Sequence, residues 1–208
     1  MNEPKPLQPI ILASQSPRRS QLLRKAGIVF EAVTPSYEEP DPSDWPMDAV
    51  SYVESISYFK ARSVASEYPN RLILAADTTV AVKGKLFGKP TDVQDARRIL
   101  TSLFGTTHEV ITGVTMYHPI GKRGLIRHAV TQASMRPMRD EELESYLTGG
   151  QWKGKAGAYG IQDHGDAFVT LIEGDFDNVV GLPVQLVLDM LAEFNIATSP
   201  MNDAQTLT

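Results

Sequence analysis

Short apolar runs alternate with longer segments of helical periodicity along this chain, and that alternation is typical of an α/β fold. The run Leu-Ile-Leu-Ala-Ala at residues 72–76 has the length and apolar character of a central, buried strand. Lys83 and Gly84 predict a hairpin turn between residues 79–82 and 86–87. Other strands are expected at residues 10–13, 28–33, 109–117, 125–135 and 167–172.

Helices are expected between these strands, with recognisable start and stop signals. Ser16 and Pro17 suit the N-cap and the first position of a helix that ends before Gly27. Thr91 with Gln94 matches a capping box that opens a helix ending at Gly105. Further helices are predicted at about residues 49–68, 140–147 and 183–194.

Composition limits the classes of function that remain. The chain has 208 residues and a formal net charge of −5, and this acidity disfavours nucleic-acid binding, which needs a basic surface. It has no cysteine, which excludes thiol catalysis and thiolate metal sites. No apolar run approaches the ~18 residues that suggest a membrane span. We expect one domain at residues 1–208, with a core at about 10–194 and flexible tails at 1–8 and 197–208. We also expect a cytoplasmic protein with neither nucleic-acid nor membrane partners.

The segment Ser-Gln-Ser-Pro-Arg-Arg at residues 14–19 joins the first strand to the first helix. Arg18 and Arg19 fall in the first helical turn, where the helix dipole disfavours cations. A bound anion would remove that conflict, because free N–H groups and guanidiniums would converge on it. An ordinary capped helix with two solvated arginines is the alternative.

Carboxylates that could bind a metal or activate water occur in two places. Asp77 follows the buried run at residues 72–76, where clefts of α/β folds open. Taken alone, the position favours the alternative, an Asp that ends the strand in a turn. Glu38 and Glu39 lie in an acidic, proline-rich loop. They are relevant only if that loop folds over the same cleft, and two solvated side chains are the alternative.

Two lysines could meet a phosphate. Lys60 lies within the predicted helix at residues 49–68, near its apolar side. Lys89 lies in Gly88-Lys89-Pro90, where the proline favours an extended backbone. For both, a surface lysine with a partly buried stem is the alternative.

A glycine-rich segment, Lys-Ala-Gly-Ala-Tyr-Gly-Ile-Gln at residues 155–162, could lie against a flat ligand. Gln162 offers a donor and an acceptor, which suits the edge of a nucleobase, whereas an unliganded turn is the alternative. The four histidines show no metal-ligand spacing, and no Walker A motif is present.

Taken together in order and spacing, these segments resemble the Maf family of nucleotide pyrophosphatases. The resemblance runs from Ile10 to about Leu191. It rests on the segments at residues 11–19, 37–39, 60–62, 76–78, 88–90, 155–162 and 180–183.

The resemblance implies an α/β, Maf/ITPase-like fold with two lobes around a central mixed sheet and a deep cleft, and a possible homodimer. It implies hydrolysis of a nucleoside triphosphate to the monophosphate and pyrophosphate with a divalent metal cation, Mg²⁺ or Mn²⁺. By position, Asp77 would be the catalytic acceptor and, with Glu39, a metal ligand. Phosphate contacts would come from Ser14, Arg19, Lys60 and Lys89.

The resemblance also bears on the base. Arg18, Thr78 and Gln162 match the dTTP/UTP branch, and a sister branch acting on 7-methyl-GTP has an aromatic residue in place of Arg18. Tyr37, Gly154 and Asp163 depart from the usual family residues, and Asp163 borders the expected base contact. A 7-methyl-GTP or other modified-nucleotide pyrophosphatase, an inosine-triphosphate-type enzyme and a non-catalytic nucleotide-binding regulator of cell division remain as alternatives.

Overall fold

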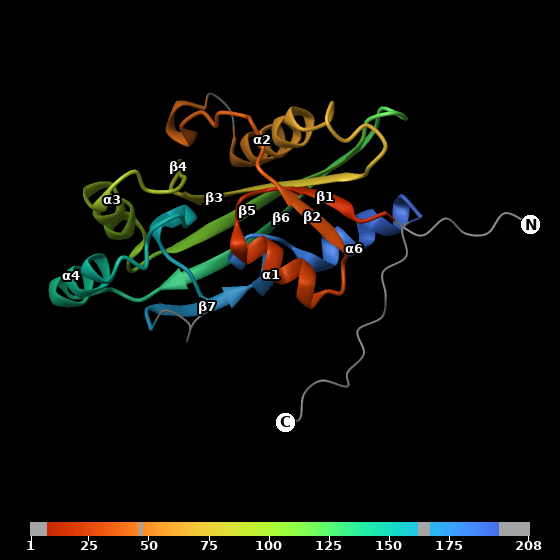
Figure 1. The fold of residues 1–208 in the computed structure, drawn as a ribbon. Helices are drawn as coiled ribbons and strands as arrows, with labels where there is room; N and C mark the ends of the chain where they lie inside the picture. The colour runs from red at the N-terminus through yellow and green to blue at the C-terminus, as the bar shows by residue number, and fades with distance from the viewer. Residues whose placement is uncertain (1–7, 46–47, 162–166, 196–208) are drawn as a thin grey trace, which may run out of the picture.

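One mixed sheet of seven strands organises the computed structural model, which describes residues 8–45, 48–161 and 167–195 (Figure 1). The strand order is β2-β1-β3-β5-β6-β7, with β4 paired to β3. β1 pairs in parallel with β2 and with β3, whereas the pairs β3–β5, β5–β6 and β6–β7 are antiparallel. The bounds are β1 Ile10–Ala13, β2 Phe30–Val33, β3 Ile73–Val82, β4 Lys85–Phe87, β5 Thr107–His118, β6 Arg123–Met135 and β7 Val169–Glu173. The predicted α/β class and mixed sheet are confirmed.

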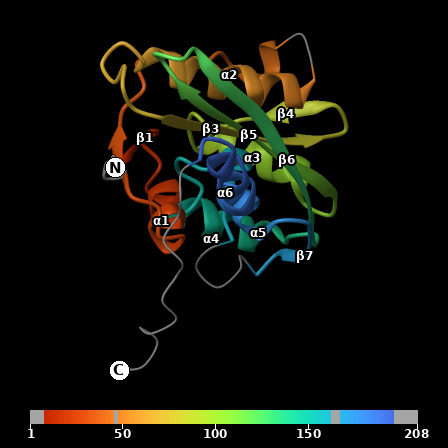
Figure 2. The same cartoon turned by 90° about the vertical axis from the view of Figure 1, so that its right-hand side faces the viewer.

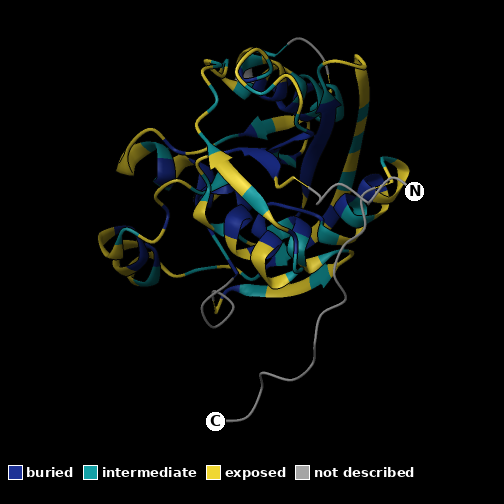
Figure 3. Ribbon diagram, turned by 45° about the vertical axis from the view of Figure 1, so that its right-hand side comes forward, coloured by how far each residue is buried: buried dark blue, intermediate teal, exposed yellow. Residues whose placement is uncertain are grey.

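Helices cover both faces of this sheet (Figures 1 and 2). Helix α2 lies over one face, and α1, α3, α4 and α6 contribute apolar side chains to the core on the other. Figure 3 shows the buried residues gathered between these layers, with the exposed residues outside. The bounds are α1 Pro17–Lys25, α2 Ala49–Ser63, α3 Val93–Leu103, α4 Asp140–Gly149, α5 Phe176–Val180 and α6 Val184–Glu193.

Strand β3 serves both layers because successive side chains of a strand point to opposite faces. Ile73 and Ala75 join the core beneath α2, whereas Leu74 and Ala76 join the core on the opposite face. The alternation predicts that Asp77 faces α2 and that Thr78 faces away from it.

Gly113 in β5 is paired directly with Asp77 in β3. A Cβ atom at Gly113 would lie 2.3 Å from the carbonyl oxygen of Val53, a backbone atom of α2. Because no side chain fits there, glycine lets α2 approach the sheet beside Asp77. This close approach brings side chains of α2 within reach of the carboxylate.

One edge of β3 is open in its middle. On that edge, β1 pairs with Ile73 and Leu74 through Ile11 and Leu12, and β4 pairs with residues 80–82. Within the described residues, the stretch between these pairings, residues 75–79, pairs only with β5 on the other edge. Asp77 and Thr78 therefore lie where a ligand can approach the sheet edge.

The structure corrects four local expectations. Asp77 does not follow a strand but lies inside one, because β3 continues through it to Val82. The helix predicted for residues 49–68 ends at Ser63. The N-cap of α3 is Asp92, whose side chain accepts a hydrogen bond from the Asp95 N–H, so the capping box at Thr91 is wrong. The short helix α5 was not predicted.

Other features follow the sequence. The hairpin around Lys83 and Gly84, the start of α1 at Pro17 and the end of α4 before Gly150 are all present. Among the described residues, no helix has both the length and the apolar character needed to cross a membrane.

Candidate functional site

A buried cation joins two carboxylates at the open edge of β3. Lys60 of α2 places its Nζ 2.6 Å from Oδ1 of Asp77 and 2.8 Å from Oε1 of Glu39. Lys60 and Asp77 are only 3% and 4% exposed. A surface position for Lys60 and a solvated turn for Asp77 are therefore both wrong. The structure brings Glu39, Lys60 and Asp77 together, whereas their roles stay predictions.

The loop that carries Glu39 folds over this cluster, as the resemblance required. Tyr52 of α2 donates a hydrogen bond of 2.9 Å from its hydroxyl to the carbonyl oxygen of Pro40 and so holds the loop.

Burial alone would raise the pKa of Glu39, but Lys60, then Lys89 and Arg19, outweigh that effect and keep the pKa below its usual value. Glu39 is therefore held as a carboxylate.

Lys89 is the accessible cation of the group. Its Nζ lies 4.0 Å from Oε1 of Glu39, and its side chain is 56% exposed. Partial burial lowers the pKa of Lys89, Glu39 opposes that shift, and Lys60 adds to it. Its side chain is free to turn toward an incoming anion more easily than the buried Lys60.

On the other face of β3, another buried cation, Arg19, is held by uncharged groups. Arg19 donates hydrogen bonds from Nε to the Gly181 carbonyl at 2.8 Å, from Nη1 to Ser14 Oγ at 3.3 Å and from Nη2 to Thr78 Oγ1 at 3.0 Å. Thr78 Oγ1 also lies 2.9 Å from the hydroxyl of Thr112. Burial lowers the pKa of Arg19, while Asp77 and then Glu39 raise it, and a guanidinium stays protonated in either case.

The motif at residues 180–183 had no assigned chemistry in the sequence, and the structure supplies its role. Gly181 follows α5 with φ of 123°, a conformation that favours glycine, and its carbonyl accepts from Arg19. Neither Gly181 nor Gly113 was predicted from the sequence as a residue that shapes the site. A glycine inside a strand pattern, as at Gly113, is the signal that could have identified one of them.

The start of α1 has the geometry predicted for it. Ser16 caps the helix by accepting from the Arg19 N–H at 3.4 Å, and Ser14 Oγ accepts from the Ser16 N–H at 3.2 Å. Arg18 turns toward the glycine-rich segment and donates from Nη2 to the Gly154 carbonyl at 2.9 Å. Arg18 and Arg19 thus serve different parts of the site.

The glycine-rich segment borders the same group of residues. The Gly157 N–H donates to the carbonyl of Gly88, the neighbour of Lys89, at 3.0 Å. Gln162 and Asp163 lie outside the described residues, so the predicted base contact at Gln162 stays a prediction.

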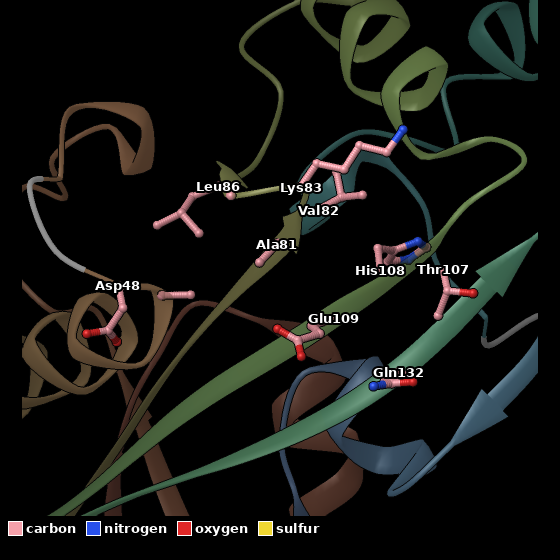
Figure 4. A pocket seen from close by; sticks show the side chains of 11 residues that line it. Asp48, Ala81, Val82, Lys83, Leu86, Thr107, His108, Glu109 and Gln132 are labelled. Atoms are coloured by element: carbon pink, nitrogen blue, oxygen red, sulfur yellow. The ribbon is translucent and has the colours of Figure 1, made fainter.

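A pocket of about 430 Å³ lies elsewhere, at the β3–β4 hairpin and the start of α2 (Figure 4). Lys83, Glu109 and Gln132 line it, and none of the predicted site residues does. We place the candidate site at the open edge of β3 because the buried charges converge there.

In the part of the chain that the structure describes, Glu39 and Asp77 are the two carboxylates that contact Lys60. Among the described residues, no group of three or more His, Cys, Asp or Glu side chains is arranged to hold a metal ion. A cation at Glu39 and Asp77 would take further oxygen ligands, which a bound molecule or water could supply.

Comparisons with known proteins agree with the resemblance seen in the sequence. The model of a family described as Maf-like protein matches residues 9–194. The chain is 40% identical to the dTTP/UTP pyrophosphatase of Symbiobacterium thermophilum over 189 residues, covering 90% of this chain and 95% of the relative. It is 44% identical to the dTTP/UTP pyrophosphatase of Salinibacter ruber over 179 residues, covering 85% and 86%.

Among solved structures, a HAM1 protein from Coxiella burnetii is similar with a TM-score of 0.52 and 13% identity. The match covers 88% of this chain and 98% of that chain. At this identity, the similarity concerns the fold alone.

Proposed function

The chain belongs to the Maf family, and we propose that it is a nucleoside triphosphate pyrophosphatase that hydrolyses dTTP and UTP to the monophosphate and pyrophosphate. The observation that carries the proposal is the cluster of Lys60, Asp77 and Glu39 at an open sheet edge, inside a chain about 40% identical to relatives that bear this activity in their names.

A triphosphate at neutral pH has nearly four negative charges, so its cleavage depends on positioning and on compensation of charge. Arg19 is suited to this role because three hydrogen bonds fix its guanidinium before a ligand arrives. Lys89 is suited to follow the phosphates because it is exposed and only loosely paired. The start of α1 beside Ser14 adds backbone N–H groups.

The residues fit a divalent cation, which we include in the proposal as Mg²⁺ or Mn²⁺. Glu39 and Asp77 supply hard oxygen ligands that already converge on one positive atom, Nζ of Lys60. Two carboxylates completed by phosphate oxygens are a common arrangement for Mg²⁺ in nucleotide enzymes. When bound, the cation would neutralise developing charge on the phosphates.

Asp77 is the residue that we propose to orient or deprotonate the attacking water. In the described part of the chain, Lys60 binds its Oδ1 atom, which leaves Oδ2 for water or for the cation. Lys60 holds the carboxylate in place, because its ammonium lies 2.6 Å from Oδ1. Pyrophosphate would leave toward the cations of Arg19 and Lys89.

The preference for pyrimidine bases rests on Arg18, Thr78 and Gln162. The O4 and N3–H of uracil and thymine present an acceptor and a donor that match the amide of Gln162. The two bases differ by one methyl group, so discrimination between them is expected to stay within ~1–3 kcal/mol.

Digestion of dTTP, UTP, CTP, GTP and 7-methyl-GTP with Mg²⁺ or Mn²⁺, with chromatography of all products, tests the proposal. We expect monophosphate and pyrophosphate in equal amounts, and the highest kcat/KM for dTTP and UTP. Diphosphate and phosphate as first products would refute the reaction. A preference for 7-methyl-GTP would refute the branch, and binding without turnover would favour the regulator.

A further inference from the structure

The glycine-rich segment at residues 154–161 is tied to several elements that surround the site. Arg18 of α1 binds the Gly154 carbonyl, and the Gly157 N–H binds the Gly88 carbonyl beside Lys89. Tyr146 of α4 donates its hydroxyl to the Ala158 carbonyl at 3.2 Å. These three contacts involve the backbone of the segment, so they leave open what holds its side chains.

A side chain of this segment has a buried partner on the sheet. The hydroxyl of Tyr159 lies 2.7 Å from Nε2 of His108 in β5, and the two rings meet edge to face with centroids 5.4 Å apart. His108 is 2% exposed and Tyr159 is 5% exposed. Burial lowers the pKa of His108 to about 4, so the imidazole is neutral at pH 7.

The hydroxyl of Tyr159 is the one hydrogen-bond partner that the described residues provide for the ring of His108. Within the described residues, its Nδ1 is buried and has no hydrogen-bond partner. Loss of the Tyr159 hydroxyl would leave both ring nitrogens unsatisfied, and a buried polar group without a partner is costly. The ring of His108 therefore favours one position of Tyr159 and, through it, of the adjoining backbone.

We propose that His108 and Tyr159 form a positioning pair that holds the glycine-rich segment in place to receive the nucleobase. The inference rests on the proposed function. It extends that function because it assigns an effect on base affinity to His108 of β5, which lies outside the cluster of Lys60, Asp77 and Glu39. Gly157 and Gly88 join the segment to the phosphate side, so its position also sets the distance between base and phosphates.

Three variants of the pair and one control variant separate the role of the hydroxyl from that of the ring. Tyr159→Phe keeps the aromatic packing and removes only the hydroxyl. His108→Leu removes both ring nitrogens, whereas His108→Gln keeps an amide near the Nε2 position and serves as the conservative rescue. Thr115→Val is the matched control, because it removes a different buried hydroxyl, 2.8 Å from that of Ser57 between α2 and β5.

The measurement compares a ligand that has a base with one that lacks it. With Mg²⁺ present, calorimetry gives the Kd of α,β-methylene-UTP, which resists cleavage between the α and β phosphates, and of inorganic tripolyphosphate. For Tyr159→Phe and His108→Leu we expect the Kd of the nucleotide analogue to rise on the order of tenfold, since small misplacements of positioning groups have effects of this size or larger. We expect the Kd of tripolyphosphate to change less than about twofold, and His108→Gln and Thr115→Val to resemble the wild type.

Equal weakening of both ligands, or of neither, would overturn the inference and leave the pair a structural contact. The same variants in steady-state hydrolysis should raise KM for UTP with little change in kcat. A wild type that binds the analogue but cleaves no nucleotide would refute the proposed function, while the calorimetric comparison would still decide the role of the pair.

Discussion

Asp77 and Thr78 are neighbours in β3, yet their side chains face different environments. On the α2 face, Asp77 meets the buried ammonium of Lys60, which also binds Glu39. On the opposite face, Thr78 meets a hydroxyl of Thr112 and the guanidinium of Arg19, which is otherwise held by uncharged acceptors. The first region depends on charges that compensate one another, whereas the second fixes one charge by geometry.

This difference determines how each region should respond to substitution. Removing one partner of a buried ion pair lowers the free energy of unfolding, because the remaining charge is desolvated without a compensating attraction. A lost hydroxyl in a group with several hydrogen bonds removes only one contact among several. The following predictions, from the largest expected effect to the smallest, test whether the two regions differ in this way.

Lys60→Met should have the largest effect on stability. It leaves Asp77 buried without its cation, and we expect the free energy of unfolding to fall by about 3–5 kcal/mol in guanidinium denaturation. The double variant Lys60→Met with Asp77→Asn should recover part of this loss, since it removes the unpaired charge. A loss below about 1 kcal/mol for the single variant would mean that the pair behaves as an exposed one.

Asp77→Asn should abolish turnover while the fold stays intact. Asparagine is nearly isosteric but cannot provide the negative charge, so we expect kcat to fall on the order of 10²-fold or more. Glu39 remains as a partner of Lys60, which limits the effect on stability. Circular dichroism checks the fold, and near-normal activity would assign the chemistry to another group.

Arg19→Lys tests whether geometry matters on the second face. Lysine keeps the charge but cannot reach three acceptors in a plane, and we expect kcat/KM to fall about 30-fold, or roughly 2 kcal/mol. The control is Arg24→Lys in the last turn of the same helix, where the side chain is exposed. If Arg19→Lys retains full activity, charge alone is sufficient on this face as well.

Lys89→Ala should weaken triphosphate use with little effect on stability. The side chain is exposed and loosely paired, so we expect about a tenfold loss of kcat/KM and a change in unfolding free energy within about 0.5 kcal/mol. Lys85→Ala in β4 is a matched exposed control. A large drop in melting temperature with unchanged kcat/KM would instead indicate a structural lysine.

Thr78→Val should have the smallest effect. The change is close to isosteric and removes one of the three recorded acceptors of Arg19, so we expect about a threefold fall in kcat/KM, near the ~0.5–1.5 kcal/mol of one hydrogen bond. A loss as large as that of Asp77→Asn would show that the two faces of β3 contribute equally, which contradicts the comparison.

Much of the fold could be predicted because local signals coincide with the elements that form. The strand at residues 10–13 and the start of α1 follow from an apolar run and from Ser16 and Pro17. The end of α2 and the position of Asp77 could not be predicted from such signals. Pairing with β5 extends β3 beyond its apolar run, and tertiary hydrogen bonds of this kind override the local pattern.

The sequence by itself determined which chemical groups are present and in what order: carboxylates at Glu39 and Asp77, cations at Arg19, Lys60 and Lys89, and a glycine-rich segment before Gln162. The tertiary structure alone decided that Lys60 is buried between the two carboxylates and that Arg19 lies on the opposite face. Because Gly113 has no side chain, α2 can pack closely against the sheet, and the carbonyl of Gly181 orients Arg19. Both effects join segments far apart in the chain, and the distances between such segments are set by packing rather than by local periodicity.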